Sequence, residues 1–168
     1  MPDSSLALRA LAAEARTSQV PGAVVRVISG GEYDLVGAYA IAAYGPYLFV
    51  GDAGDGTTGS PSYVTEVDAL TGAPVRVVTG PQYKFYLPGA VASDGPDLFV
   101  LNEGSAAGNG TNTGVGSLTD IDAATGALVR VISGPKYDFT YEAAMAAAGP
   151  RVFVAGGGSS GTVTEFPA

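Results

Sequence analysis

The side chains with which this sequence could do chemistry carry oxygen, because its 168 residues include no His and no Cys. Ser-His-Asp and Cys-His catalytic sets are therefore excluded, as are metal sites built on imidazole or thiolate. We predict no catalytic residue. Asp52, Asp55, Asn102 and Glu103 could instead offer carboxylate and amide oxygens to a hard cation such as Ca²⁺, which takes about 6–8 of them.

The same side chains have two other interpretations. Asp52 and Glu103 form the one acidic pair that we consider for glycosidase-type catalysis, which needs two carboxyl groups about 5–9.5 Å apart. Asp, Asn and Gly are equally the ordinary residues of turns. The segment DAGDG (52–56) also lacks the acidic spacing and the closing Glu of an EF-hand loop. Cation site, acid pair and turn all remain open at the level of sequence.

Tyrosine recurs at one position of a repeated pattern, as Tyr33, Tyr83 and Tyr137. A ring of tyrosines could stack against sugars or other flat ligands, because the phenol combines an apolar face with a polar tip. The alternative is that a side chain present in every repeat packs one repeat against the next. The substitution Tyr83→Phe separates the two, because packing predicts a loss of stability and ligand contact predicts a loss of binding.

Three copies of one unit position these residues. The segment GAVVRVISGGEYDL (22–35) returns as GAPVRVVTGPQYKF (72–85) and as GALVRVISGPKYDF (126–139). A second block follows each copy: AIAAYGPYLFV (40–50), AVASDGPDLFV (90–100) and AMAAAGPRVFV (144–154). The unit repeats after 50 residues from Gly22 to Gly72 and after 54 from Gly72 to Gly126.

Within a unit the apolar residues alternate with a period of two or form short runs between turn residues, and both patterns indicate β-strands. Four strands fit the first unit, at about 38–43, 47–51, 62–68 and 73–79. A period near 50 residues with four short strands is typical of a β-propeller blade. We therefore predict an all-β fold of four-stranded blades, in which three blade repeats make half or a fragment of a ring. A solenoid of shorter coils is the alternative.

The second blocks of units one and two resemble the first two strands of NHL-type propeller repeats, and DIDAATGALVRV (120–131) resembles a strand corner of YVTN-type and quinoprotein-type blades. The resemblance spans residues 22–166. It implies a propeller scaffold without a fixed activity, because such propellers serve as scaffolds, carbohydrate binders, lyases or lactonases. The chain has no Trp, unlike quinoprotein blades, and no His to act as the base of streptogramin lyases, which share this architecture.

The repeated units do not begin and end where the blades do. Two complete four-stranded blades span 36–79 and 87–133. Residues 22–29 match a fourth strand without three strands before it, and the third blade at 141–166 lacks a fourth strand. We expect two copies of the chain to exchange the 22–29 strand and close a six-bladed homodimer. The alternative is that the missing blades belong to a longer propeller enzyme, lyase-like or lactonase-like, with an acid- or metal-based site.

A charge pattern supports this exchange. In two units an acid precedes an arginine by ten residues, at Glu66 and Arg76 and at Asp120 and Arg130. Across a hairpin such residues lie opposite each other, where unlike charges contribute about 0.2–1 kcal/mol. Glu165 lacks a following arginine and Arg26 lacks a preceding acid. Each is therefore the predicted partner of the other, and solvated charges on outer strands are the alternative.

Loop length distinguishes one end of the predicted blades. The connections between second and third strands are long and variable, at 51–62, 101–117 and 155–161, whereas the turns at the opposite end are short. Because variable loops on a rigid scaffold often carry binding, we predict a non-catalytic binding or scaffold module that uses this face. Asp52 and Glu103 are expected there, at equivalent strand ends of neighbouring blades, with the tyrosines beside them.

Composition excludes other partners. A net charge of −8 argues against nucleic acid, and no apolar run approaches the ~20 residues of a membrane helix. Asp3 and Arg9 interrupt any signal-peptide pattern in the first 21 residues, so a cytoplasmic location is the default expectation. Within this N-terminal segment, residues 4–16 favour a helix that either forms or frays.

Overall fold

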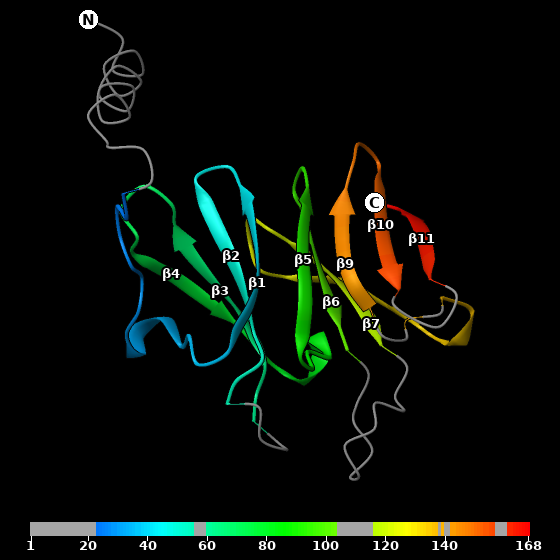
Figure 1. Cartoon of the computed structure of the whole chain (residues 1–168), viewed down its shortest axis with the longest axis horizontal. Helices are drawn as coiled ribbons and strands as arrows, with labels where there is room; N and C mark the ends of the chain where they lie inside the picture. Colours follow the sequence, from blue (N-terminus) through cyan, green and yellow to red (C-terminus); the bar gives the residue numbers. More distant parts are fainter. Residues whose placement is uncertain (1–22, 56–59, 104–115, 138, 140–141, 157–160) are drawn as a thin grey trace, which may run out of the picture.

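A computed structural model gives the fold and describes residues 23–55, 60–103, 116–137, 139, 142–156 and 161–168. Three antiparallel sheets stand side by side, each following the order of its strands in the chain (Figure 1). Sheet 1 contains β1 (Ala38–Tyr44), β2 (Tyr47–Asp52), β3 (Tyr63–Asp68) and β4 (Pro74–Val78). Sheet 2 contains β5 (Pro88–Asp94), β6 (Asp97–Asn102), β7 (Ser117–Asp122) and β8 (Leu128–Ser133). Sheet 3 contains β9 (Glu142–Ala147), β10 (Arg151–Gly156) and β11 (Thr162–Pro167).

The predicted fold class is confirmed. The chain is all-β, and its sheets are the blades of a partial β-propeller. The four strands of sheet 1 lie within one or two residues of the predicted ranges. One-turn 3₁₀ helices η1 (Gly31–Tyr33), η2 (Pro81–Tyr83) and η3 (Pro135–Tyr137) precede the three inner strands. The inner strands β1, β5 and β9 run next to one another, which is the arrangement around a propeller axis (Figure 1).

Two kinds of turn build each four-stranded blade. The first and second strands are joined by a two-residue Gly-Pro turn, in which Gly45 has a φ of 57° that suits the first position of this hairpin. The third and fourth strands are joined by a corner that Asp68 organises. One carboxylate oxygen of Asp68 accepts hydrogen bonds from the amide and hydroxyl of Thr71, and Gly72 then takes a φ of 76°. Asp122, Thr125 and Gly126 repeat this corner in sheet 2.

Apolar cores fill the two joints between neighbouring sheets. The joint of sheets 1 and 2 buries side chains from both, among them Phe49, Val64, Val91, Val100 and Ile121. The joint of sheets 2 and 3 repeats the pattern with Phe99, Leu118, Phe139, Val152 and Phe166. Each sheet alternates its side chains between two neighbours, as a blade must, so the outward faces of sheets 1 and 3 have no sheet against them in this chain.

Sheet 3 has three strands, and β11 is its outer edge. Residues 23–29 form no strand among the described residues, and their valines are exposed. The predicted pairing of 22–29 with another copy is not tested by a single chain. The predicted N-terminal segment 1–21 lies outside the described residues. Among the described residues, no helix is long and apolar enough to cross a membrane.

Candidate functional site

Asp52 accepts hydrogen bonds from the backbone just before β1, the innermost strand of sheet 1. It ends β2, is fully buried, and uses both carboxylate oxygens as acceptors. The backbone amides of Val36 and Gly37 donate to it at 3.0 Å, and the amide of Gly54 donates at 2.7 Å. A carboxylate saturated by backbone amides fixes the surrounding chain, because each amide gains a charge-assisted partner. Asp52 therefore organises the linker into β1 and the start of the β2–β3 loop.

Asn102 likewise bonds the backbone before the innermost strand of sheet 2. Its amide oxygen accepts from the backbone of Tyr86 at 3.3 Å, and its amide nitrogen donates to the Thr119 hydroxyl at 3.0 Å. Asp52 faces Ala38 in the strand register, and Asn102 faces the equivalent Pro88. The expectation that Asp52 and Glu103 occupy equivalent strand ends was therefore wrong, because the register makes Asp52 and Asn102 equivalent.

Glu103 lies one residue beyond β6 and is partly exposed. It borders a cavity of about 60 Å³ that is also lined by Tyr39, Ala53, Leu87 and Gly89. The backbone amide of Glu103 donates to the carbonyl of Leu87, a residue with a positive φ of 45°. The cavity lies at the end of β1 and β5 from which the long loops emerge, and Glu103 is the predicted acid that lines it.

The described residues contain no group of three or more acidic side chains that could hold a metal ion. The pKa of Tyr63 is raised mainly by burial and then by the negative charges of Asp52, Asp34 and Asp55. A calcium site at Asp52, Asp55, Asn102 and Glu103 stays a prediction, and the amides already bound to Asp52 argue for the turn interpretation of that residue.

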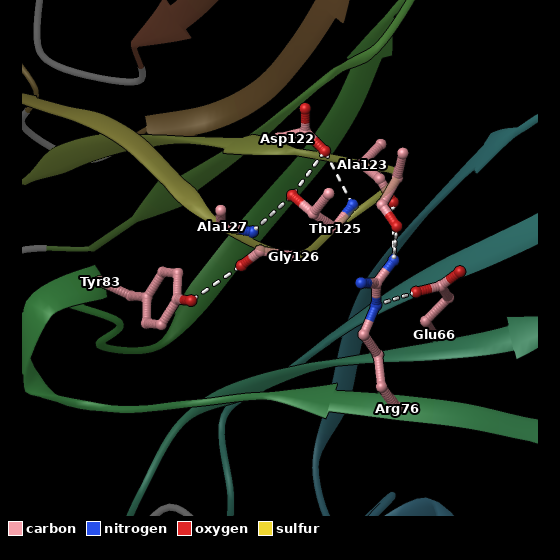
Figure 2. A network of polar contacts seen from close by, with 9 residues as sticks. Glu66, Arg76, Tyr83, Asp122, Ala123, Thr125, Gly126 and Ala127 are labelled. Carbon is pink, nitrogen blue, oxygen red and sulfur yellow. Dashed lines mark hydrogen bonds and ion pairs between the residues drawn. The ribbon is translucent and has the colours of Figure 1, made fainter.

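Of the repeated tyrosines, Tyr83 and Tyr137 pack in the joints between sheets, and Tyr33 is bonded to the corner of sheet 1, which has no sheet before it among the described residues. The Tyr33 hydroxyl donates to the Gly72 carbonyl at 2.8 Å. The Tyr83 hydroxyl donates to the Gly126 carbonyl at the same distance (Figure 2). Tyr137 stacks on Phe139 with ring centroids 5.7 Å apart. Tyr33 and Tyr83 thus each connect the segment that precedes a sheet to the corner between the third and fourth strands of that sheet. This arrangement favours packing between blades over ligand contact as the role of the tyrosines.

The predicted ion pairs across the outer hairpins are present. Glu66 faces Arg76 in the register and pairs with it, and Asp120 faces Arg130 at 2.8 Å. Both acids are buried. Burial raises the pKa of Asp120, although the charge of Arg130 opposes that effect.

Each of these arginines also reaches the next sheet, which the sequence pattern did not reveal. Arg76 donates to the carbonyls of Ala123 at 2.9 Å and Ala124 at 2.8 Å (Figure 2). Arg130 donates to the carbonyl of Pro167 at 3.3 Å. One guanidinium thus neutralises a buried acid on its own sheet and caps the backbone of the neighbouring sheet, which suits the several donors of a planar guanidinium.

Two charged residues differ from this scheme. Glu165 pairs with Arg151 on the adjacent strand, and both side chains are largely exposed. Arg26 makes no ion pair among the described residues, but it donates to the carbonyl of Leu70 at 3.1 Å. The sequence pattern does not predict the pair of Glu165 and Arg151, because the pattern relates each acid to an arginine ten residues downstream and Arg151 precedes Glu165.

These contacts define a class of protein, an array of β-propeller blades with a common polar joint. No protein-family model and no curated protein matches the chain. Among solved structures, Kuenenia stuttgartiensis hydrazine synthase is similar with a TM-score of 0.57 and 20% identity, over 90% of this chain and 36% of that chain. The computationally designed Ika4 protein gives a TM-score of 0.44 and 17% identity, over 87% of this chain and 98% of that chain. This chain thus spans about a third of the hydrazine synthase chain, and the likeness concerns the fold alone.

Proposed function

We propose that this chain is a non-catalytic binding or scaffold module of the NHL or YVTN type, and that two copies close a six-bladed ring. In this ring sheet 3 of each copy packs against sheet 1 of the other. The proposal rests on one observation: the outward faces of these two sheets expose the side chains whose counterparts are buried in the internal joints.

The outward face of sheet 3 shows this most clearly. Val163 of β11 is 70% exposed, whereas its counterparts Val64 and Leu118 are fully buried. The counterparts follow from the register, because Val163 lies two residues before Glu165 just as Val64 precedes Glu66. Fully burying a valine is favourable by about 1.5–3 kcal/mol, so this face gains by acquiring a neighbour.

The outward face of sheet 1 is the complementary surface. Ile41 of β1 is 62% exposed, and its counterpart Val91 of β5 is buried at 8%. Ile41 pairs with Val50 as Val91 pairs with Val100, which fixes the equivalence. The joint of sheets 1 and 2 already shows how the two kinds of face fit. A second copy supplies the matching face at each end.

The loop face of such a ring is the proposed binding surface. At the opposite end the Gly-Pro turns between first and second strands are tight. At the loop face the strand ends around Asp52 and Asn102 are braced by buried hydrogen bonds, and the cavity beside Glu103 opens between β1 and β5. A rigid rim with variable loops above it is the usual setting for ligand recognition.

Absolute molar mass by light scattering tests the assembly. The expected value is twice 16.7 kDa, and a mass of 16.7 kDa at working concentrations overturns the proposal in favour of further blades from a longer chain. Val163→Asp places a charge on the outward face of sheet 3 and is expected to give the single-chain mass. Val129→Asp is the matched control, because Val129 is 53% exposed on a sheet that already has both neighbours.

A ligand screen on the closed ring then tests the binding face. Glu103→Gln keeps the size of the side chain and removes its charge, so a ligand that uses the cavity should bind more weakly to this variant. The fold should be unaffected, because the structure shows its backbone amide, rather than its carboxylate, anchoring Glu103 to Leu87.

A further inference from the structure

The segment 23–29 already occupies the place of a fourth strand in a blade that this chain does not contain. Arg26 donates to the carbonyl of Leu70 at the corner of sheet 1, just as Arg76 of β4 donates to the corner of sheet 2. Leu70 in the corner after Asp68 corresponds to Ala124 after Asp122. Arg26 therefore makes the arginine-to-carbonyl contact of a joint, although residues 23–29 belong to no sheet among the described residues.

Tyr33 completes the same joint. Its hydroxyl donates to Gly72 as that of Tyr83 donates to Gly126, and its carbonyl accepts from Thr65 at 2.8 Å as that of Tyr83 accepts from Thr119. The whole run from Arg26 to Tyr33 therefore contacts sheet 1 as the end of sheet 1 contacts sheet 2. Figure 1 shows this run outside β4, at the opposite end of the molecule from β11.

Residues 23–29 contain the same valine and arginine pattern as β4 and β8, but they pair with no strand among the described residues. Val24 and Val27 are each 78% exposed. β11 presents the reverse case, since it is paired with β10 on one side and has an open edge on the other. Natural sheets seldom leave such an edge unprotected, because its free amides and carbonyls recruit another strand.

We propose, on the basis of the two-copy ring, that residues 24–28 of one copy pair antiparallel with β11 of the other in a single defined register. The internal blades set this register. Glu66 faces Arg76 and Thr65 faces Val77, and the same pairing recurs at Asp120 with Arg130 and Thr119 with Val131. Glu165 of one copy accordingly faces Arg26 of the other, and Thr164 faces Val27.

Charge supports the same register. In both complete blades the third strand carries an acid and the fourth carries the arginine that neutralises it. In the described part of the single chain, Glu165 has only the exposed Arg151 as its ionic partner. Arg26 makes no ion pair there. Hydrogen bonds within the corner lower the pKa of Asp68, and the charge of Arg26 adds to that effect. On exchange Glu165 gains Arg26, which remains bound to Leu70, so the third joint acquires the acid, arginine and carbonyl set of the other two.

A cysteine pair tests the register directly, because the chain has no Cys of its own. Facing residues of antiparallel strands bring their Cα atoms to about 4.5–5.5 Å, which suits a disulfide. The variant Val27→Cys with Thr164→Cys is expected to oxidise to a covalent dimer of twice 16.7 kDa on a non-reducing gel. Val27→Cys with Thr162→Cys, two positions out of register, is the matched control and should cross-link at least tenfold less.

A charge exchange supplies an independent readout. Arg26→Glu and Glu165→Arg each place like charges at both joints of a homodimer, so each variant alone should dimerise at least tenfold more weakly than the wild type. An equimolar mixture restores an opposite pair at both joints and should recover the dimer.

The outcomes separate this inference from the ring on which it rests. A wild type that runs as a single chain refutes both. A wild-type dimer without the in-register cross-link, or a mixture that does not recover dimerisation, refutes the strand exchange and leaves the ring to be held by the sheet faces alone.

Discussion

The arginine of each joint gives the most quantitative prediction. Arg76 is the cation beside Glu66, whose side chain is 1% exposed. The substitution Arg76→Met keeps an unbranched side chain to cover the core and removes the charge and both hydrogen bonds to sheet 2. Glu66 is then left ionised in a buried position with no cation, or it must take up a proton to fold.

The magnitude follows from burial. Removing one partner of a buried ion pair costs about 3–5 kcal/mol, because the remaining charge is not compensated. For a domain of this size each kcal/mol lowers the melting temperature by about 2–4 °C, so Arg76→Met should melt roughly 6–20 °C below the wild type. Arg151→Met is the matched control, since its pair with Glu165 has side chains 59% and 46% exposed. Exposed pairs are worth at most about 1 kcal/mol.

Urea unfolding followed by circular dichroism measures both variants, with the slope of the transition checked for two-state behaviour. The double variant Glu66→Gln with Arg76→Met should recover part of the loss, because the amide carries no charge to desolvate. Equal costs for Arg76→Met and Arg151→Met would refute the argument, as would a double variant no more stable than Arg76→Met. Either result means that Glu66 does not depend on Arg76 in the folded chain.

Three further predictions concern the joints and turns. Tyr83→Phe removes the hydrogen bond to Gly126 and should cost about 0.5–1.5 kcal/mol in urea unfolding, whereas Tyr47→Phe, whose hydroxyl has no bond to the described residues, should cost nothing measurable. Gly95→Ala should cost about 1–2 kcal/mol, from its positive φ alone, because the space around its position is open. The pKa values of Asp68 and Asp122 are lowered by hydrogen bonds from Thr71 and Thr125, so their contribution is present above the ordinary Asp pKa of about 3.9. It is lost as pH falls through their folded pKa values, which acid titration of the melting temperature should show and which a flat profile from pH 5 downward would contradict.

The strands were predictable because the repeat superposes three weak signals at the same positions. Short continuous apolar runs, such as those before each long loop, fit either a strand or a buried helix segment when taken alone. Gly-Pro turns and the Thr-Gly corner, recurring at fixed distances, delimit those runs in each unit. The cross-strand pair of Glu66 and Arg76 followed from the same spacing, since a hairpin of known corner places residues ten apart opposite each other.

The site was less predictable, because the equivalence of strand ends depends on the strand register and not on residue type. Asp52 follows Pro46 by six residues and Asn102 follows Pro96 by six, so counting from the turns pairs these two and leaves Glu103 one residue further out. A signal for the bracing role was therefore present in the sequence. No comparable signal shows that Arg76 reaches Ala123, because that contact depends on how two sheets are placed relative to each other.

The geometry of repeated joints also limits how many copies the proposed assembly can hold. Every joint between blades is heterologous, since the outgoing face of one sheet meets the incoming face of the next, and such contacts continue until they close a ring or extend as a filament. Propellers close with about 4–8 blades. With three sheets in each chain, one copy leaves both faces open and three copies exceed this range. Two copies give six blades, and the two-fold axis makes both new joints identical. The chain therefore needs one kind of joint, repeated four times within the copies and twice between them.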